Sequence, residues 1–229
     1  MLQKTSRHMH VELQDVGRTV ESHEILRNIQ LTLEGAGYTV IRGSSGSGKT
    51  TLAAIVAGVI PPTSGRCVTP LRSSIGYVEQ RPTFYEHLSA FENVLAGAAA
   101  RGLSRTDAAS QSLELFADLG ISHVRTRPIH KLSVWERTLV AVARAYVGGT
   151  TMIVADQLFD GNDEAAVRTT ADTLLKLNDN SRAILITTTS PTTDLLFPGS
   201  VVYELRDGVL MNISKLPTQD VLDHTGDSA

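Results

Sequence analysis

The sequence contains a single cysteine, and this scarcity excludes several classes of protein. One thiol, Cys67, cannot form an intramolecular disulfide, so a secreted disulfide scaffold is excluded. The cysteine and histidine residues also do not cluster at the spacings typical of a zinc site. We therefore expect a protein of a reducing compartment, with Cys67 as a packing residue.

Excess basic charge and long apolar runs are also absent. The chain has 21 Lys and Arg against 24 Asp and Glu, a formal net charge of -3, so no basic field favours a nucleic acid partner. The longest apolar run near the N-terminus, Leu52 to Ile60, is too short to span a bilayer, and the first ten residues lack the apolar core of a secretory signal. We expect a cytoplasmic protein that reaches the inner face of a membrane only through partner subunits.

The pattern of apolar residues predicts an α/β fold with a largely parallel sheet. Apolar runs bounded by turn residues alternate with helical patterns, and the short polar stretch between the first two runs predicts antiparallel strands at one edge. Residues from about 82 to 146 have an almost entirely helical pattern, which indicates an inserted helical subdomain. We expect residues 1–229 to form one domain with a frayed tail from about residue 217.

A glycine-rich stretch carries the clearest chemical signal. The strand-like "YTVIR" leads into "GSSGSGKTT" and then into the helical "LAAIVAG", an order typical of a phosphate-binding loop rather than of a simple glycine turn. The glycines allow several N–H groups to point into one concavity, Lys49 can reach the β- and γ-phosphates, and the Thr50 hydroxyl can bind Mg²⁺. We expect a nucleoside triphosphate to be bound by the residues of this loop: Gly43, Ser44, Ser45, Gly46, Ser47, Gly48, Lys49, Thr50 and Thr51.

A second strand delivers an acid to the same expected edge of the sheet. The apolar run "MIVA" places Asp156 at the carboxyl end of a central strand, where ligands of open α/β sheets bind and where a carboxylate can serve Mg²⁺. An aspartate that merely caps a helix is the simpler alternative.

With both halves in place, the sequence resembles the nucleotide-binding subunit of ABC transporters over nearly its whole length. The loop matches the family's Walker A motif, "IGYVEQRP" is similar to its Q-loop, and "KLSVWERTLVAVARAYV" stands at the position of its signature helix. The resemblance implies a P-loop NTPase core that binds ATP and Mg²⁺, with Thr50, Gln80 and Asp156 at the metal. It also implies a second nucleotide-binding subunit, and a transmembrane subunit that contacts the region from Gln80 to Val94.

The signature itself departs from the family's L-S-G-G-Q. Leu132 and Ser133 remain, whereas Val134, Trp135 and Glu136 replace the two glycines and the glutamine. Two bulky side chains crowd the close approach that glycines allow at a phosphate, and Glu136 adds a negative charge there. Trp135 has two possible roles, at the nucleotide or against a partner surface.

The catalytic positions of the family are also replaced. Gln157 stands at the position of the general base, and an amide can orient water but cannot accept its proton. Thr189 stands where the resemblance places the switch histidine, and Val20 stands where it places an aromatic residue against adenine, with His23 nearby.

These replacements lead to a hypothesis about assembly and to two alternatives. We expect a degenerate subunit that holds ATP and hydrolyses it slowly or not at all, in a dimer for which a heterodimer is favoured over a homodimer. A soluble ATP-gated dimerisation switch without a transport role is the first alternative, and a small P-loop kinase is the second. The sequence offers no lid arginines or acceptor pocket for a kinase.

Overall fold

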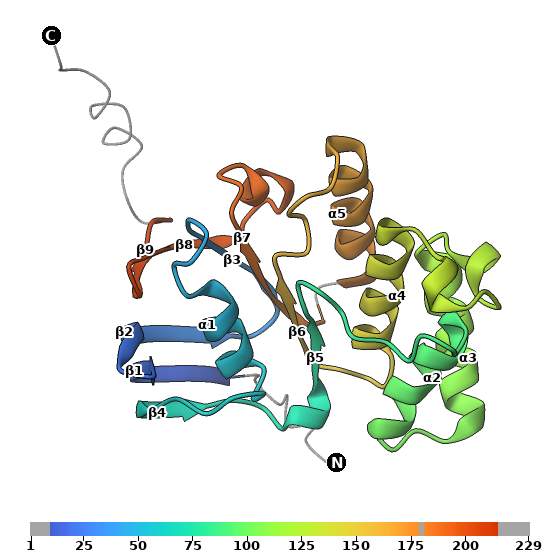
Figure 1. Cartoon of the computed structure of the whole chain (residues 1–229), viewed down its shortest axis with the longest axis horizontal. Helices are drawn as coiled ribbons and strands as arrows, with labels where there is room; N and C mark the ends of the chain where they lie inside the picture. The colour runs from blue at the N-terminus through green and yellow to red at the C-terminus, as the bar shows by residue number, and fades with distance from the viewer. Residues whose placement is uncertain (1–9, 179–180, 215–229) are drawn as a thin grey trace, which may run out of the picture.

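The computed structural model describes residues 10–178 and 181–214, which form two sheets with helices packed on them (Figure 1). The tail that we expected to be frayed, from about residue 217, lies outside the described residues.

The larger sheet has six strands and is parallel except at one edge. Its strands, in spatial order, are β5 (Ile75–Val78), β6 (Met152–Asp156), β7 (Ala183–Thr188), β3 (Gly37–Arg42), β8 (Val201–Arg206) and β9 (Val209–Asn212). Only the pair β8 and β9 is antiparallel. The predicted α/β fold with a largely parallel sheet is therefore confirmed.

The first strands of the chain form a second, antiparallel sheet. Strand β1 (His10–Val20) lies between β2 (His23–Glu34) and β4 (Ser64–Val68). The expected antiparallel strands are thus present, although they form a sheet of their own instead of an edge of the larger one.

The helices lie in three places. Helix α1 (Lys49–Val56) packs on β6 and β7, near β2, and α5 (Glu164–Asn178) lies beside α4 (Val134–Tyr146) in Figure 1. Helices α2 (Ala90–Ala100) and α3 (Arg105–Asp118) pack on α4 and on each other. No strand lies between β5 and β6 within residues 79–151, all of which are described. The division of the chain into a core and a helical subdomain stays a prediction.

Alternating side chains of the larger sheet supply two separate hydrophobic cores. Val40 and Ile184 face a core shared with α4 and α5, whereas their neighbours Ile41 and Leu185 face a core shared with α1, β1 and β2. A strand buried on both faces reads as a continuous apolar run, which explains the patterns of β3, β6 and β7. Because these strands are parallel, their carboxyl ends meet at one edge, where ligands of such sheets bind.

Candidate nucleotide-binding site

The glycine-rich loop joins β3 to α1 at that edge of the sheet. Gly46 and Gly48 have φ angles of 80° and 103°, a region that side chains disfavour. A Cβ on Gly48 would also lie 2.8 Å from Leu26 Cδ2, and a Cβ on Gly43 would overlap the carbonyl oxygen of Leu205. The tight curl of the loop therefore requires glycine at these places, and it presents the first turn of α1 to the same concavity.

Lys49 lies across the loop. Its ammonium group donates to the carbonyl oxygens of Gly43 at 2.8 Å and Ser44 at 2.7 Å, and only 3% of the residue is exposed. Burial lowers the pKa of Lys49, and the nearby carboxylates of Asp160 and Asp156 oppose that shift. The loop therefore holds a partly desolvated cation beside its backbone N–H groups, which is the chemistry that binds a polyphosphate.

A cavity of about 380 Å³ opens over this loop. Its wall contains eight of the predicted site residues, which are Ser45, Gly46, Gly48, Lys49, Thr50, Thr51, Gln80 and Gln157. The remaining loop residues Gly43, Ser44 and Ser47 do not line the cavity, and the Ser47 hydroxyl is buried without a hydrogen-bond partner among the described residues. Thus residues from the loop, from the segment after β5 and from the end of β6 meet in one place.

The cavity wall also contains Ile25, which the sequence analysis missed. Ile25 belongs to β2, and neither Val20 nor His23 lines the cavity. The His23 ring instead lies 3.2 Å from the backbone oxygen of Glu21. The sequence carries no local signal for this role of Ile25, because the role depends on how β2 lies beside α1.

Asp156 lies fully buried at the tip of β6, beneath the cavity. Its Oδ1 accepts a hydrogen bond of 2.5 Å from Thr187 Oγ1, whereas its Oδ2 has no partner among the described residues. A buried carboxylate oxygen without a partner costs free energy, and a bound cation or its water would satisfy it. Oxygen donors are what Mg²⁺ prefers, so Asp156, Thr50 and Gln80 fit the metal that the family resemblance implies.

Gln157 reaches from the end of β6 to the phosphate-binding loop. Its backbone has a φ of 50°, and its N–H donates to both oxygens of Thr187 at 3.0 Å. The side-chain amide donates to Thr50 Oγ1 at 3.1 Å. The amide therefore occupies a central position between the strand tip and the expected metal ligand.

Thr189 does not line the cavity, because Asp160 binds it. The backbone N–H and the hydroxyl of Thr189 donate to Asp160 Oδ2 at 3.2 and 2.8 Å, and Thr188 Oγ1 donates to Oδ1 at 3.0 Å. The end of β7 is thus attached to the loop after β6 through a carboxylate, and the sequence analysis did not foresee this role for Asp160.

The altered signature begins α4, away from this cavity. Val134 is 77% exposed, whereas the Trp135 indole packs against its own hydrophobic core and donates to Thr170 Oγ1 at 3.3 Å. Leu132 is buried just before the helix. The indole therefore has an intramolecular contact, while its roles at the nucleotide or against a partner stay predictions. Val134 is the bulky residue that the helix presents to solvent.

Glu136 forms a capping box with Ser133. The Ser133 side chain accepts from the Glu136 N–H at 3.2 Å, and Glu136 accepts from the Ser133 N–H at 2.7 Å. Hydrogen bonds from the Ser133 backbone, above all, lower the pKa of Glu136, and Arg127 and His123 at 3.7 and 3.4 Å contribute. The expected negative charge toward polyphosphate is thus compensated locally.

We expect Ser133→Ala to lower the free energy of unfolding by about 1 kcal/mol, because one orphan N–H of α4 loses its acceptor. Urea denaturation measures the change. Ser122→Ala is the matched control, since Ser122 is exposed and makes no side-chain hydrogen bond to any described residue. Equal stability of the two variants would contradict the capping role.

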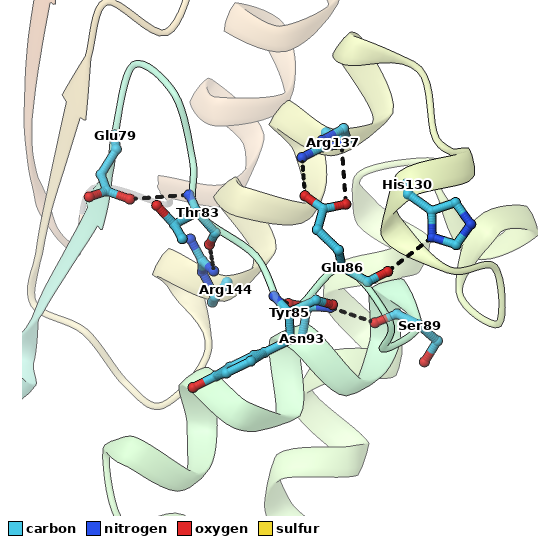
Figure 2. Close-up of polar contacts among 9 residues, drawn as sticks. All are labelled: Glu79, Thr83, Tyr85, Glu86, Ser89, Asn93, His130, Arg137 and Arg144. Carbon is cyan, nitrogen blue, oxygen red and sulfur yellow. Dashed lines mark hydrogen bonds and ion pairs between the residues drawn. The ribbon is translucent and has the colours of Figure 1, made fainter.

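The segment after Gln80 is fastened to α4, as Figure 2 shows. Arg144 donates to the Thr83 oxygen at 2.6 Å, and Arg137 pairs with Glu86 at 2.6 Å. The Phe84 ring lies 4.8 and 5.4 Å from the guanidinium carbons of these two arginines. The region from Gln80 to Val94 therefore connects the cavity wall to the signature helix.

Two features are missing from residues 10–178 and 181–214. In this part of the chain no helix has the length and apolarity to cross a membrane. The same residues contain no group of three or more His, Cys, Asp or Glu that could hold a metal ion.

Comparison with known proteins gives concordant matches. Residues 26–159 match the family described as ABC transporter. The macrolide export ATP-binding/permease protein MacB of Campylobacter jejuni is 28% identical over 218 residues, which are 89% of this chain and 34% of that relative. The chain therefore spans about a third of the length of MacB.

A relative of similar length and a solved structure agree with that match. The lipoprotein-releasing system ATP-binding protein LolD 1 of Rhodopirellula baltica is 31% identical over 206 residues, 83% of this chain and 90% of that protein. The dimeric structure of MJ0796, a bacterial ABC transporter cassette, superposes with a TM-score of 0.80 at 22% identity, over 88% of this chain and 97% of that chain. At this identity the likeness of the two structures shows the fold alone.

Proposed function

Because the chain belongs to the ABC transporter family, we propose that it is an ATP-binding subunit of a membrane transport complex that holds its nucleotide and hydrolyses it slowly or not at all. The observation that carries the proposal is the position of Gln157. Its amide follows the buried Asp156 and contacts Thr50 on the phosphate-binding loop, where a general base would have to act.

Binding follows from the residues around the cavity. The loop N–H groups and Lys49 would bind the phosphates, and Thr50, Gln80 and Asp156 would hold Mg²⁺, which would neutralise phosphate charge. Gln157 can orient a water molecule with its amide, but it cannot take the proton. Loss of a positioned base costs roughly 10² to 10⁴ in rate.

The altered signature supports a heterodimer. The family resemblance implies that the signature of one subunit closes over the nucleotide bound to the other, and MJ0796 is described as a dimer. Here Val134 and the packed Trp135 replace the glycines at the start of α4. A homodimer of this chain would contain two altered sites, so we propose a partner subunit that contributes the intact catalytic residues.

The membrane partner would contact the region from Gln80 to Val94. MacB is named as an ATP-binding/permease protein, and this chain spans only the part that corresponds to about a third of its length. We propose that a transmembrane partner supplies the permease function and keeps the chain at the cytoplasmic face of the membrane. The exposed Tyr85, which is attached to α2 through Asn93, belongs to the contact surface.

One preparation tests binding and turnover together. We expect the purified full chain to retain radiolabelled ATP with Mg²⁺, and the bound label to remain largely ATP after several minutes, because no base completes the site. Thin-layer chromatography of the bound nucleotide measures this. Turnover at about 1 s⁻¹ or faster, within the usual range of enzymes, would refute slow hydrolysis, and absence of ATP binding would refute the whole proposal.

Co-purification separates the transport subunit from the soluble alternative. Detergent-solubilised membranes should yield the chain together with a transmembrane subunit. An ATP-dependent dimer that never associates with a membrane subunit would instead favour the soluble dimerisation switch.

A further inference from the structure

Asp160 places a carboxylate close to the phosphate-binding loop, although it does not line the nucleotide cavity. The loop follows β3, Asp160 follows β6, and Thr188 ends β7, the strand that lies between those two in the sheet. The Gly43 N–H donates to the backbone oxygen of Thr188 at 3.2 Å, and Thr188 Oγ1 donates to Asp160 Oδ1 at 3.0 Å. The carboxylate is therefore joined to the first residue of the loop through a single threonine.

The same part of the loop holds the ammonium group of Lys49, which donates to the Gly43 oxygen at 2.8 Å. Burial lowers the pKa of Lys49, and the carboxylate of Asp160 opposes that shift more than the carboxylate of Asp156 does. The electrostatic field of Asp160 thus extends to the place where a bound phosphate would meet Lys49.

The charge of Asp160 is not cancelled by a cation at close range. Its carboxylate accepts hydrogen bonds from the hydroxyl groups of Thr188 and Thr189 and from the backbone N–H of Thr189, all of which are neutral donors. No ion pair joins Asp160 to any residue that the structure describes, and Arg42 at the end of β3 pairs instead with Asp194 at 3.3 Å. The negative charge is therefore held in a fixed position without being neutralised there.

ATP and ADP differ by the γ-phosphate, which a lysine at the position of Lys49 contacts together with the β-phosphate. A carboxylate that attracts this ammonium group repels an anion bound beside it. We propose that Asp160 determines specificity at this site by opposing the γ-phosphate, so that the chain holds ADP at least about as tightly as ATP. The inference rests on the proposed function, which supplies the nucleotide, and it makes ADP a second resident ligand of the site.

Titration of the full chain with ATP and with ADP, each with Mg²⁺, tests the inference. We expect the two dissociation constants of the unchanged chain to agree within about threefold or to favour ADP. Asp160→Asn should tighten ATP binding by about 10-fold and change ADP binding much less, because it removes the repulsion between two charges near a protein surface. Isothermal titration calorimetry measures all four constants.

Two controls separate the charge from the hydrogen bonds. Thr189→Val removes the 2.8 Å hydrogen bond to Asp160 but keeps the carboxylate, so the ratio of the two dissociation constants should not change. Asp172→Asn should also leave the ratio unchanged, since it neutralises an exposed acid on α5 that makes no side-chain hydrogen bond or ion pair to a described residue. Asp160→Ser is a second neutral variant that should act like Asp160→Asn, and it keeps the test valid if the asparagine impairs folding.

The outcomes separate this inference from the proposed function. ATP binding more than about 10-fold tighter than ADP binding in the unchanged chain would overturn the inference. A ratio that stays the same in the neutral variants of Asp160 would also overturn it, as would an equal rise in Thr189→Val, because the effect would then come from the hydrogen bond. Failure of the unchanged chain to bind either nucleotide would instead refute the proposed function, and the inference with it.

Discussion

Gln157→Glu is expected to raise the steady-state ATPase rate of the chain by about 10²-fold, the lower end of the effect of a positioned base. The carboxylate would stand where the amide now lies, 3.1 Å from Thr50 Oγ1. It could accept a hydrogen bond from the Thr50 hydroxyl group and could take a proton from water. The lower end applies because Thr189 offers no imidazole and remains bound to Asp160.

Gln157→Asn is the matched control for this experiment. It shortens the side chain without supplying a base, so its turnover should stay at or below that of the unchanged chain. ATP affinity should change little in either variant, because Lys49 and the loop N–H groups are untouched. Equal turnover of the Glu and Asn variants would mean that the missing base does not limit hydrolysis.

Lys49→Met is expected to weaken ATP binding by about 100-fold or more, since charge-assisted hydrogen bonds to phosphate are worth about 1.5–3 kcal/mol each and Lys49 can reach two phosphates. The measurement is isothermal titration with ATP and Mg²⁺. The change also leaves the backbone oxygens of Gly43 and Ser44 without their hydrogen-bond donor. The thermal unfolding of the variant without nucleotide is therefore measured as well, to show that it is folded.

Lys131→Met provides the comparison for that variant. Lys131 is exposed and makes no side-chain hydrogen bond or ion pair to any residue that the structure describes, so the affinity for ATP should be unchanged. An unchanged affinity in the Lys49 variant would show that the loop does not bind ATP as proposed.

Local sequence predicted the features that depend on a few adjacent residues. The strand, the glycine-rich loop and the following helix are contiguous in the chain, and the positive φ angles of Gly46 and Gly48 explain why glycine occurs there. The buried position of Asp156 follows from the apolar run before it. The capping box of Ser133 and Glu136, which the sequence analysis did not identify, follows the pattern S-x-x-E that is typical of a helix start.

Contacts between distant residues could not be predicted in this way. Gln157 and Thr50 are 107 positions apart, and the hydrogen bond between them depends on how β6 and α1 are placed on the sheet. Trp135 turns toward Thr170 because α5 offers it a hydroxyl group and an apolar surface. Ile25 lines the nucleotide cavity because the second sheet lies beside α1, which no local pattern specifies.

The attachment of Thr188 and Thr189 to Asp160 would oppose the introduction of a functional switch histidine at position 189. A histidine that replaced Thr189 alone would meet the Asp160 carboxylate, which already binds that position at 2.8 Å, and would pair with it when protonated. We expect Thr189→His to gain no activity until a neutral residue also replaces Asp160. The two positions are therefore expected to be epistatic.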